Sequence, residues 1–163
     1  MKKLWAPWRM EYILQPKLQE CIFCVKPKEQ RDRENFILYR GTDVFVIMNY
    51  YPYNNGHLMV VPFRHVSNLS LLTTAERLQC MDLLGNCCKI LSDVIKAQGF
   101  NIGMNLGRVA GAGIDDHLHF HIVPRWNGDT NYMPITGHTK VISQGLTELW
   151  DELKPLFNAA LGA

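Results

Sequence analysis

The sequence has no long hydrophobic segment and no cluster of basic residues. None of its apolar runs approaches the roughly 18 residues that a membrane span needs, which argues against a membrane protein. The 17 Lys and Arg residues form no stripe and the formal net charge is only +2, so nucleic acid is not an expected partner. The N-terminal segment MKKLWAPWRMEY has two lysines but no small-residue cleavage site, so a secretory signal is not expected.

The cysteine content excludes a disulfide framework. The chain has five cysteines, an odd number, and Cys87 and Cys88 are adjacent. A reducing cytoplasm is therefore the expected compartment. The sequence also has no internal repeat and no low-complexity segment. Its 163 residues predict a single domain, which we divide into an N-terminal segment (about 1–35), a core (about 36–126) and a C-terminal tail with a helix (about 127–163).

The predicted elements follow the order strands, one long helix, then strands. The first strand-like runs are NFILYR, DVFVIMNY and GHLMVVPF, and the YPYNNG turn lies between the last two. The clearest helix spans residues 73–99, because Thr73 and Glu76 have the spacing of a capping box and Gly99 fits a C-terminal stop. Its apolar residues at helical intervals are Leu78, Met81, Leu84, Cys88, Leu91 and Ile95.

The rest of the chain adds further strands and a second helix. FNIGMNLG follows the long helix and leads through a glycine-rich loop to a strand that carries three histidines. A C-terminal helix is predicted over about 145–157, with Pro155 near a bend or an end. Because short loops join neighbouring strands, the predicted fold class is α+β, with an antiparallel sheet of about five strands.

Three of the six histidines stand at alternate positions in the segment DDHLHFHIVPRW. On a strand, alternate side chains share one face, so His117, His119 and His121 are predicted to face the same way. The apolar residues between them then face a core. Lone histidines are usually structural, but three in register with strictly apolar residues between them indicate a functional site.

Two kinds of chemistry fit three histidines on one face. In the first, all three bind one catalytic metal ion that keeps an open position. In the second, one neutral imidazole attacks a phosphorus atom while its neighbours orient it or bind the substrate. The preceding loop NLGRVAGAG favours phosphate chemistry, because amides near Gly107, Gly111 and Gly113 can approach an anion closely. An ordinary surface turn would explain the loop by itself.

The segment CIFC, residues 21–24, indicates a separate metal site. Cys-x-x-Cys suits two ligands of a tetrahedral zinc ion, and His65 with one histidine of the strand are the natural candidates for the other two. A redox pair or two packed thiols would also explain the motif. The other three cysteines lie on the predicted long helix and are interpreted as packing residues: Cys80, Cys87 and Cys88.

HLHFHIV fits the pattern His-φ-His-φ-His-φ-φ, in which φ is apolar, and resembles the signature of the histidine triad (HIT) superfamily of nucleotide hydrolases and transferases. The likeness extends to FVIMNYYPYNNGHLMVVPFRHV, the long helix and the glycine loop, from about Cys21 to Trp126. VPRWNGDTNYMPITGHTKVI is similar to a narrower bacterial branch, the diadenosine tetraphosphate phosphorylases or ATP adenylyltransferases. The resemblance implies a HIT-like fold, a homodimer, and an enzyme of the nucleotidyltransferase or hydrolase type.

The resemblance also implies catalytic and metal-binding roles for individual residues. His119 would be the nucleophile, and His121 would contact the scissile phosphate. A structural zinc ion would be bound in a zinc-knuckle-like N-terminal segment, where the family pattern gives the four ligands Cys21, Cys24, His65 and His117. The metal and the covalent chemistry would thus use different histidines of the triad.

The substrate implied by the resemblance is an adenine nucleotide derivative. Matching binding positions are Ile22 and Phe23 at the base, Asn49 at the ribose hydroxyls and Asn105 beside the phosphates. One departure precedes the triad, where other branches have Gln and then Ser or Thr but this chain has Gly113 and Ile114. Backbone amides of the loop at Gly111 and Gly113 would then bind phosphate instead.

The hypothesis is therefore a dinucleoside polyphosphate-cleaving enzyme that works through a nucleotidyl–His119 intermediate. Inorganic phosphate as the acceptor would make it a phosphorylase, and water would make it a hydrolase acting on adenylyl derivatives. A non-catalytic, zinc-stabilised nucleotide-binding module is the competing class. The three-histidine catalytic metal site is a third alternative.

Overall fold

The computed structural model of the chain describes residues 20–130 and 141–162. Its elements are α2 (Ile22–Val25), the 3₁₀ turn η1 (Lys26–Glu29), α3 (Asp32–Asn35), β1 (Ile37–Arg40), β2 (Val44–Met48), β3 (Leu58–Pro62), η2 (Leu69–Leu71), α4 (Thr74–Val94), β4 (Gly99–Gly103), η3 (Arg108–Ala110), β5 (Phe120–Arg125) and α6 (Leu146–Leu161). None of the helices in these ranges is both long and apolar enough to span a membrane. Residues 1–19 of the N-terminal segment and residues 131–140 of the branch-specific tail lie outside the described residues, and the single-domain organisation stays a prediction.

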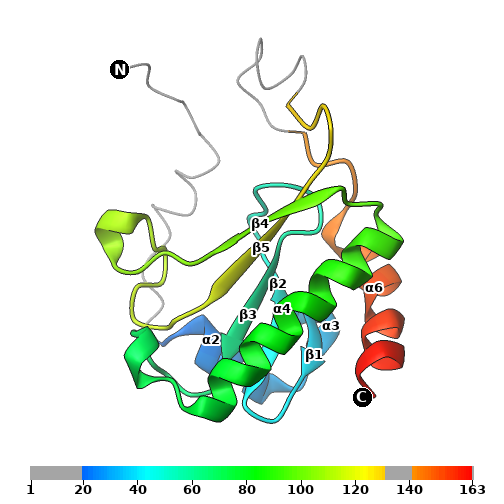
Figure 1. Ribbon diagram of the computed structural model, residues 1–163. Helices are drawn as coiled ribbons and strands as arrows, with labels where there is room; N and C mark the ends of the chain where they lie inside the picture. The colour runs from blue at the N-terminus through cyan, green and yellow to red at the C-terminus, as the bar shows by residue number, and fades with distance from the viewer. Residues whose placement is uncertain (1–19, 131–140, 163) are drawn as a thin grey trace, which may run out of the picture.

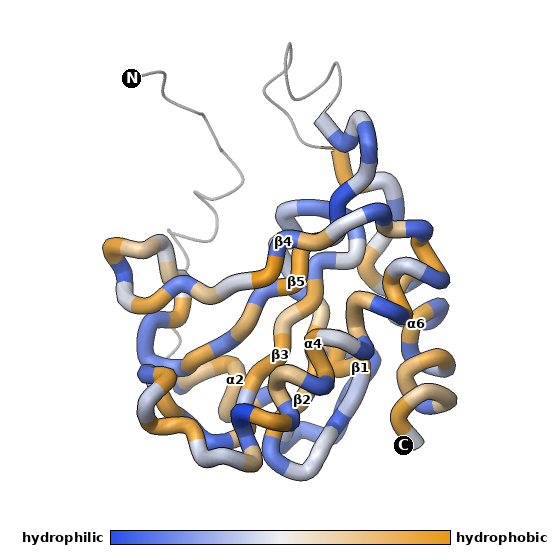
Figure 2. Tube along the Cα trace, in the orientation of Figure 1, coloured by the Kyte–Doolittle hydropathy of each residue, from blue (hydrophilic) through white to orange (hydrophobic). Residues whose placement is uncertain are grey.

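The five strands form one antiparallel sheet in the order β1-β2-β3-β5-β4, which confirms the predicted α+β class (Figure 1). One row of paired residues crosses the whole sheet: Ile37, Ile47, Met59, His121 and Gly103. The two central strands β2 and β3 are buried along their full lengths. They form the apolar centre of the molecule in Figure 2.

The two faces of the sheet are covered differently. Helix α4 crosses one face and α6 packs beside it over β1 (Figure 1). Strand residues such as Val46, Val60 and Ile122 face these helices and form the larger core. Their sequence neighbours Ile47 and Met59 face the opposite side, where Phe23 of α2 packs on them. Because side chains alternate along a strand, His121 faces this second side, away from the long helices.

The long helix starts as predicted but ends earlier. Thr73 caps it, and Glu76 completes a capping box by accepting the Thr73 amide at 2.7 Å. The predicted stop at Gly99 is wrong, because Gly99 pairs with Arg125 in the sheet and begins β4. The chain leaves the helix at Lys96 instead, a left-handed residue with φ 54° whose ammonium bonds the carbonyl oxygen of Asp93 at 2.6 Å.

Two details of helix packing also differ from the sequence prediction. Leu78 and Met81 of α4 are 64% and 63% exposed, because the stripe toward the sheet runs through Cys80, Leu84 and Cys87 instead. Pro155 was predicted near a bend or an end, but it lies inside α6. The helix continues to Leu161 because a buried stripe on both sides of the proline holds it against the core, formed by Leu149, Leu153 and Phe157.

Candidate functional site

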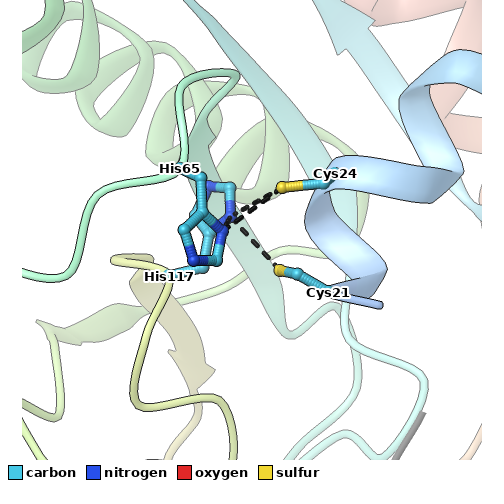
Figure 3. Close-up of side chains that lie close together, drawn as sticks. All are labelled: Cys21, Cys24, His65 and His117. Atoms are coloured by element: carbon cyan, nitrogen blue, oxygen red, sulfur yellow. Dashed lines mark hydrogen bonds between the residues drawn. The ribbon is translucent and has the colours of Figure 1, made fainter. Parts of the chain in front are cut away.

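Two thiols and two imidazoles converge at one end of the sheet (Figure 3). The Cys24 sulfur lies 3.3 Å from Nδ1 of His65 and 3.5 Å from Nδ1 of His117, and the Cys21 sulfur lies 3.3 Å from the same His117 atom. The two Nδ1 atoms are 3.2 Å apart, and all four ligand atoms lie within 4.8 Å of one another. A tetrahedral zinc ion, with bonds of about 2.0–2.3 Å, separates two nitrogens by about 3.3 Å and nitrogen from sulfur by about 3.5 Å. The donor set therefore fits zinc in both chemistry and spacing.

Three separate segments supply this cluster. The cysteines come from one turn at the start of α2, His65 follows β3, and His117 precedes β5 (Figure 3). The Leu118 amide donates to the Val66 carbonyl at 2.6 Å, which holds the two histidine segments side by side. The neighbouring Arg64 makes a two-pronged ion pair with the buried Glu76 at 3.0 and 2.7 Å, so the His65 loop is fixed to the first turn of α4.

The protonation of His117 suits a metal ligand. Its Nε2 lies 2.8 Å from the Pro62 carbonyl oxygen, which can only accept, so the ring proton is on Nε2 and the Nδ1 lone pair faces the thiols. Burial raises the pKa of the Cys21 thiol to about 11. Reactive redox cysteines have lowered pKa values, so this environment speaks against the redox-pair interpretation of CIFC.

A pocket opens next to the cluster, and Phe23 lies between the two. The Phe23 ring centroid is 5.4 Å from that of His117 and 5.0 Å from that of His119. The pocket lining includes every predicted substrate-binding and catalytic residue, namely Ile22, Phe23, Asn49, Asn105, Gly111, Gly113, His119 and His121. It also includes residues that the sequence analysis did not assign to the site, namely Lys26, Ile47, Met48, Tyr50, Tyr51, Tyr53, Met59 and Ile114.

The sheet register divides this pocket into two ends. His121 on β5 pairs with Met59 on β3, which pairs with Ile47 on β2. Ile47 therefore lies two strands, or about 10 Å, from His121. The β5 end has imidazoles, an amide side chain and glycines, whereas the β2 end is largely apolar. Such a pocket matches a ligand with a polar group at one end and a flat apolar group at the other.

His119 is oriented by the backbone of its own strand. Its Nδ1 lies 2.8 Å from the His117 carbonyl oxygen, so Nδ1 carries the proton and Nε2 keeps a free lone pair. The side chain is only 6% exposed, and this burial lowers its pKa and favours the neutral imidazole. A neutral imidazole with a bare Nε2 is the form that acts as a nucleophile.

His121 carries its ring proton on Nε2, opposite to His119, and a hydrogen bond from His57 determines this tautomer. The Tyr53 amide donates to Nδ1 of His57 at 3.1 Å, so the His57 proton is on Nε2, which lies 3.0 Å from Nδ1 of His121. His121 therefore carries its own proton on Nε2. Burial and the neighbouring imidazoles lower the pKa of His57 to about 3 and that of His121 to about 4, so both are neutral donors.

The glycine loop offers a smaller set of amides than the sequence suggests. Gly107 and Gly111 have φ values of +78° and +91°, which favour glycine. However, Gly107 does not line the pocket, and the Gly111 amide donates to the Arg108 carbonyl at 2.9 Å. Within the described residues, the Gly113 amide has no hydrogen-bond partner and remains available to a ligand.

The predicted site residues thus come together in two adjoining groups. Strand β5 begins only at Phe120, so His117 and His119 lie in the segment before it. The predicted alternation of side chains still holds, because Leu118 and Ile122 are buried on the side opposite the histidines. Within the described ranges, the only group of three or more metal-type ligands is the cysteine–histidine cluster. This arrangement speaks against one catalytic metal bound by all three triad histidines.

The sequence prediction missed His57 and Lys26. His57 shares a face with the pocket residue Met59, two positions along the strand, and Lys26 follows the pocket residue Ile22 at helical spacing. Helical spacing from Ile22, already assigned to the site, would have found Lys26, whereas Met59 was not assigned and gave no such signal for His57. The roles of all these residues stay predictions.

Comparison with known proteins adds sequence relatives and a matching fold. The family described as HIT domain matches residues 30–128. A Mycobacterium tuberculosis protein named AP-4-A phosphorylase is 39% identical over 156 residues, covering 91% of this chain and 80% of that protein. An uncharacterised HIT-like protein of Methanocaldococcus jannaschii is 30% identical over 134 residues, covering 82% and 98%. A zinc-bound histidine triad family protein from Mycobacterium smegmatis has the same fold, with a TM-score of 0.70 at 21% identity over 86% of this chain and 95% of that one.

Proposed function

Because the chain belongs to the HIT family, we propose that it is an enzyme that cleaves dinucleoside polyphosphates of the diadenosine tetraphosphate type, with inorganic phosphate as the acceptor. The observation that carries this proposal is the pair of opposite tautomers in the pocket, the bare Nε2 of His119 beside the protonated Nε2 of His121. One atom supplies an electron pair and the other a hydrogen bond. The similarity to the AP-4-A phosphorylase supports the choice of substrate.

In the first step, Nε2 of neutral His119 attacks the α-phosphorus of the bound dinucleotide. The bond from that phosphorus to the bridging oxygen breaks, ATP leaves, and adenylyl–His119 remains. The Nδ1 proton of His119 stays bonded to the His117 carbonyl, which stabilises the charge on the ring. His121 donates a hydrogen bond to the phosphoryl oxygens as charge develops on them.

In the second step, an oxygen of inorganic phosphate attacks the same phosphorus. The phosphorus–nitrogen bond breaks, ADP leaves, and His119 regains its lone pair.

The polyphosphate contacts the Gly113 amide and Asn105, which line the histidine end of the pocket. The ribose contacts Asn49, and the base lies on Ile22 and Phe23, which pack with Ile47.

We also propose that the cysteine–histidine cluster binds a structural zinc ion, held by Cys21, Cys24, His65 and His117. The metal supplies a cross-link between α2 and the two histidine segments and takes no part in the phosphoryl chemistry. Asp116 supports this assignment, because its carboxylate lies 3.8 Å from Nε2 of His65. Carboxylates outside the ligand set commonly orient metal-bound imidazoles in this way.

Two further parts of the proposal concern assembly and location. The protein forms a homodimer through the edge strand β4 and the long helix α4; β4 has one unpaired edge, and Ile102 on it is 49% exposed. The compartment is the cytoplasm, because all five cysteines are free thiols.

Product analysis with diadenosine tetraphosphate tests the function. We expect ATP and ADP in equal amounts, formed only when inorganic phosphate is present. ATP and AMP without phosphate would instead identify a hydrolase. No cleavage together with nucleotide binding, and no adenylylated protein in the intact mass spectrum, would favour the non-catalytic binding module and reject the proposal.

A further inference from the structure

One lysine lies in the pocket wall and has no bonded partner among the residues that the structure describes. Lys26, the first residue of η1, is half-buried and lines the pocket. Among the described residues its ammonium has no hydrogen bond or ion pair. Glu29 is close enough to act on its charge, but that carboxylate accepts hydrogen bonds from Asn35 at 2.7 Å and Arg31 at 3.1 Å instead. A half-buried lysine in a pocket wall, whose ammonium has no partner among the described residues, is suited to a ligand acceptor.

The backbone at Lys26 is held beside β1. Its carbonyl accepts a hydrogen bond from Asn35 at 3.4 Å, and the carbonyl of the next residue, Pro27, accepts one from Arg40 at 2.8 Å. Asn35 and Arg40 flank and end β1, which is separated from the His121 strand by β2 and β3. The lysine thus belongs to the β1–β2 end of the pocket, where Ile47 forms the apolar floor.

We propose that Lys26 is a specificity residue that reads the base of the bound nucleotide and extends the substrate class to guanine-containing dinucleoside polyphosphates. This inference rests on the proposed function, which puts the phosphates at His119 and therefore the base at the Lys26 end. An ammonium has three donors and no acceptor. Guanine presents two adjacent acceptors, O6 and N7, whereas adenine presents N7 beside an amino group that only donates. Lys26 therefore discriminates in favour of guanine.

Lysine-to-methionine substitution tests the proposal, because it keeps the length of the side chain and removes its charge and donors. The measured quantity is kcat/KM for diguanosine tetraphosphate divided by kcat/KM for diadenosine tetraphosphate. We expect Lys26→Met to lower this ratio about tenfold, the low end of the range for a lost base contact. Lys26→Arg should keep the ratio within about threefold of the wild type, because arginine preserves the donors.

Lys28→Met is the matched control, since Lys28 lies on the same 3₁₀ turn but is exposed and outside the pocket lining. It should leave the ratio unchanged. An equal loss for both substrates in Lys26→Met would show a contact to phosphate rather than to the base and would overturn the proposal. An unchanged ratio would overturn it as well.

Calorimetric binding of GMP and AMP separates this inference from the proposed enzymatic function. If the wild-type protein cleaves neither dinucleotide, the function fails, yet the ratio of the two dissociation constants still measures base selection. A tenfold change of that ratio in Lys26→Met would support the role of Lys26. An unchanged ratio, with wild-type thermal stability of the variant, would reject it.

Discussion

His117 and His119 are two residues apart, both buried, and both donate one ring N–H to a backbone carbonyl, yet they have different surroundings. His117 donates through Nε2 to Pro62 and presents Nδ1 to two thiols. His119 donates through Nδ1 to the His117 carbonyl and presents Nε2 to the pocket. The choice of nitrogen follows from which carbonyl lies nearby, so the backbone turns one lone pair toward the thiols and the next toward the pocket, as the two proposed roles require.

Loss of the pocket-facing lone pair should have the largest effect on turnover. We expect His119→Asn to lower kcat by at least about 10³-fold, because it removes the lone pair that forms the proposed covalent intermediate. Binding of AMP, measured by calorimetry, should change little, and the melting temperature should stay near that of the wild type. Retention of more than a tenth of the activity would mean that His119 is not the nucleophile.

Disruption of the cysteine–histidine cluster should mainly lower the thermal stability of the protein. We expect Cys21→Ser to lose most of its zinc, measured by elemental analysis against about one ion per chain in the wild type, and to melt at least about 5 °C lower. Cys88→Ser is the control, because Cys88 lies on α4 outside the cluster. A wild-type protein purified without chelator and free of zinc would contradict the assignment.

The last prediction concerns the acid stability of the His57–His121 pair, which matters only below about pH 6.5. Their pKa values are about 3 and about 4 in the folded protein but near 6.5 when unfolded, so below about pH 6.5 the unfolded chain binds more protons. The free energy of unfolding should fall from pH 6.5 toward pH 4 by at most about 1.4 kcal/mol per pH unit for each histidine, with no contribution above that range.

Urea denaturation of the wild type and His57→Leu at several pH values measures this contribution. The difference between the two proteins cancels any effect of zinc release, which both share. The variant should show a shallower loss of stability between pH 6.5 and pH 4. Equal slopes would mean that His57 is not held neutral by the fold.

Strand parity carries most of what the sequence could predict about this protein. The alternation of histidines with Leu118 and Ile122 was sufficient to put the triad on one face. The helix cap at Thr73 was also predicted, because its capping box needs only Thr73 and Glu76, three positions apart. The tautomers of the histidines could not be predicted from the sequence, because they depend on carbonyls from distant segments. The carbonyl that fixes His117 belongs to Pro62, 55 positions earlier in the chain.

The errors arose where tertiary contacts override local signals. Gly99 has the composition of a helix stop but is needed as a sheet partner of Arg125. Pro155 breaks an isolated helix but is tolerated in α6, because Leu153 and Phe157 are buried on either side of it. His57 escaped notice because a single histidine at the start of a strand has no pattern of its own.

The register between β3 and β5 has a consequence for how this protein can misfold. Met59 pairs with His121, and a slip of one residue would turn Phe120 toward the pocket and move the histidines under the helices. The proposed nucleophile His119 and the proposed metal ligand His117 would both leave their positions in the same movement, because they lie on the segment that leads directly into β5.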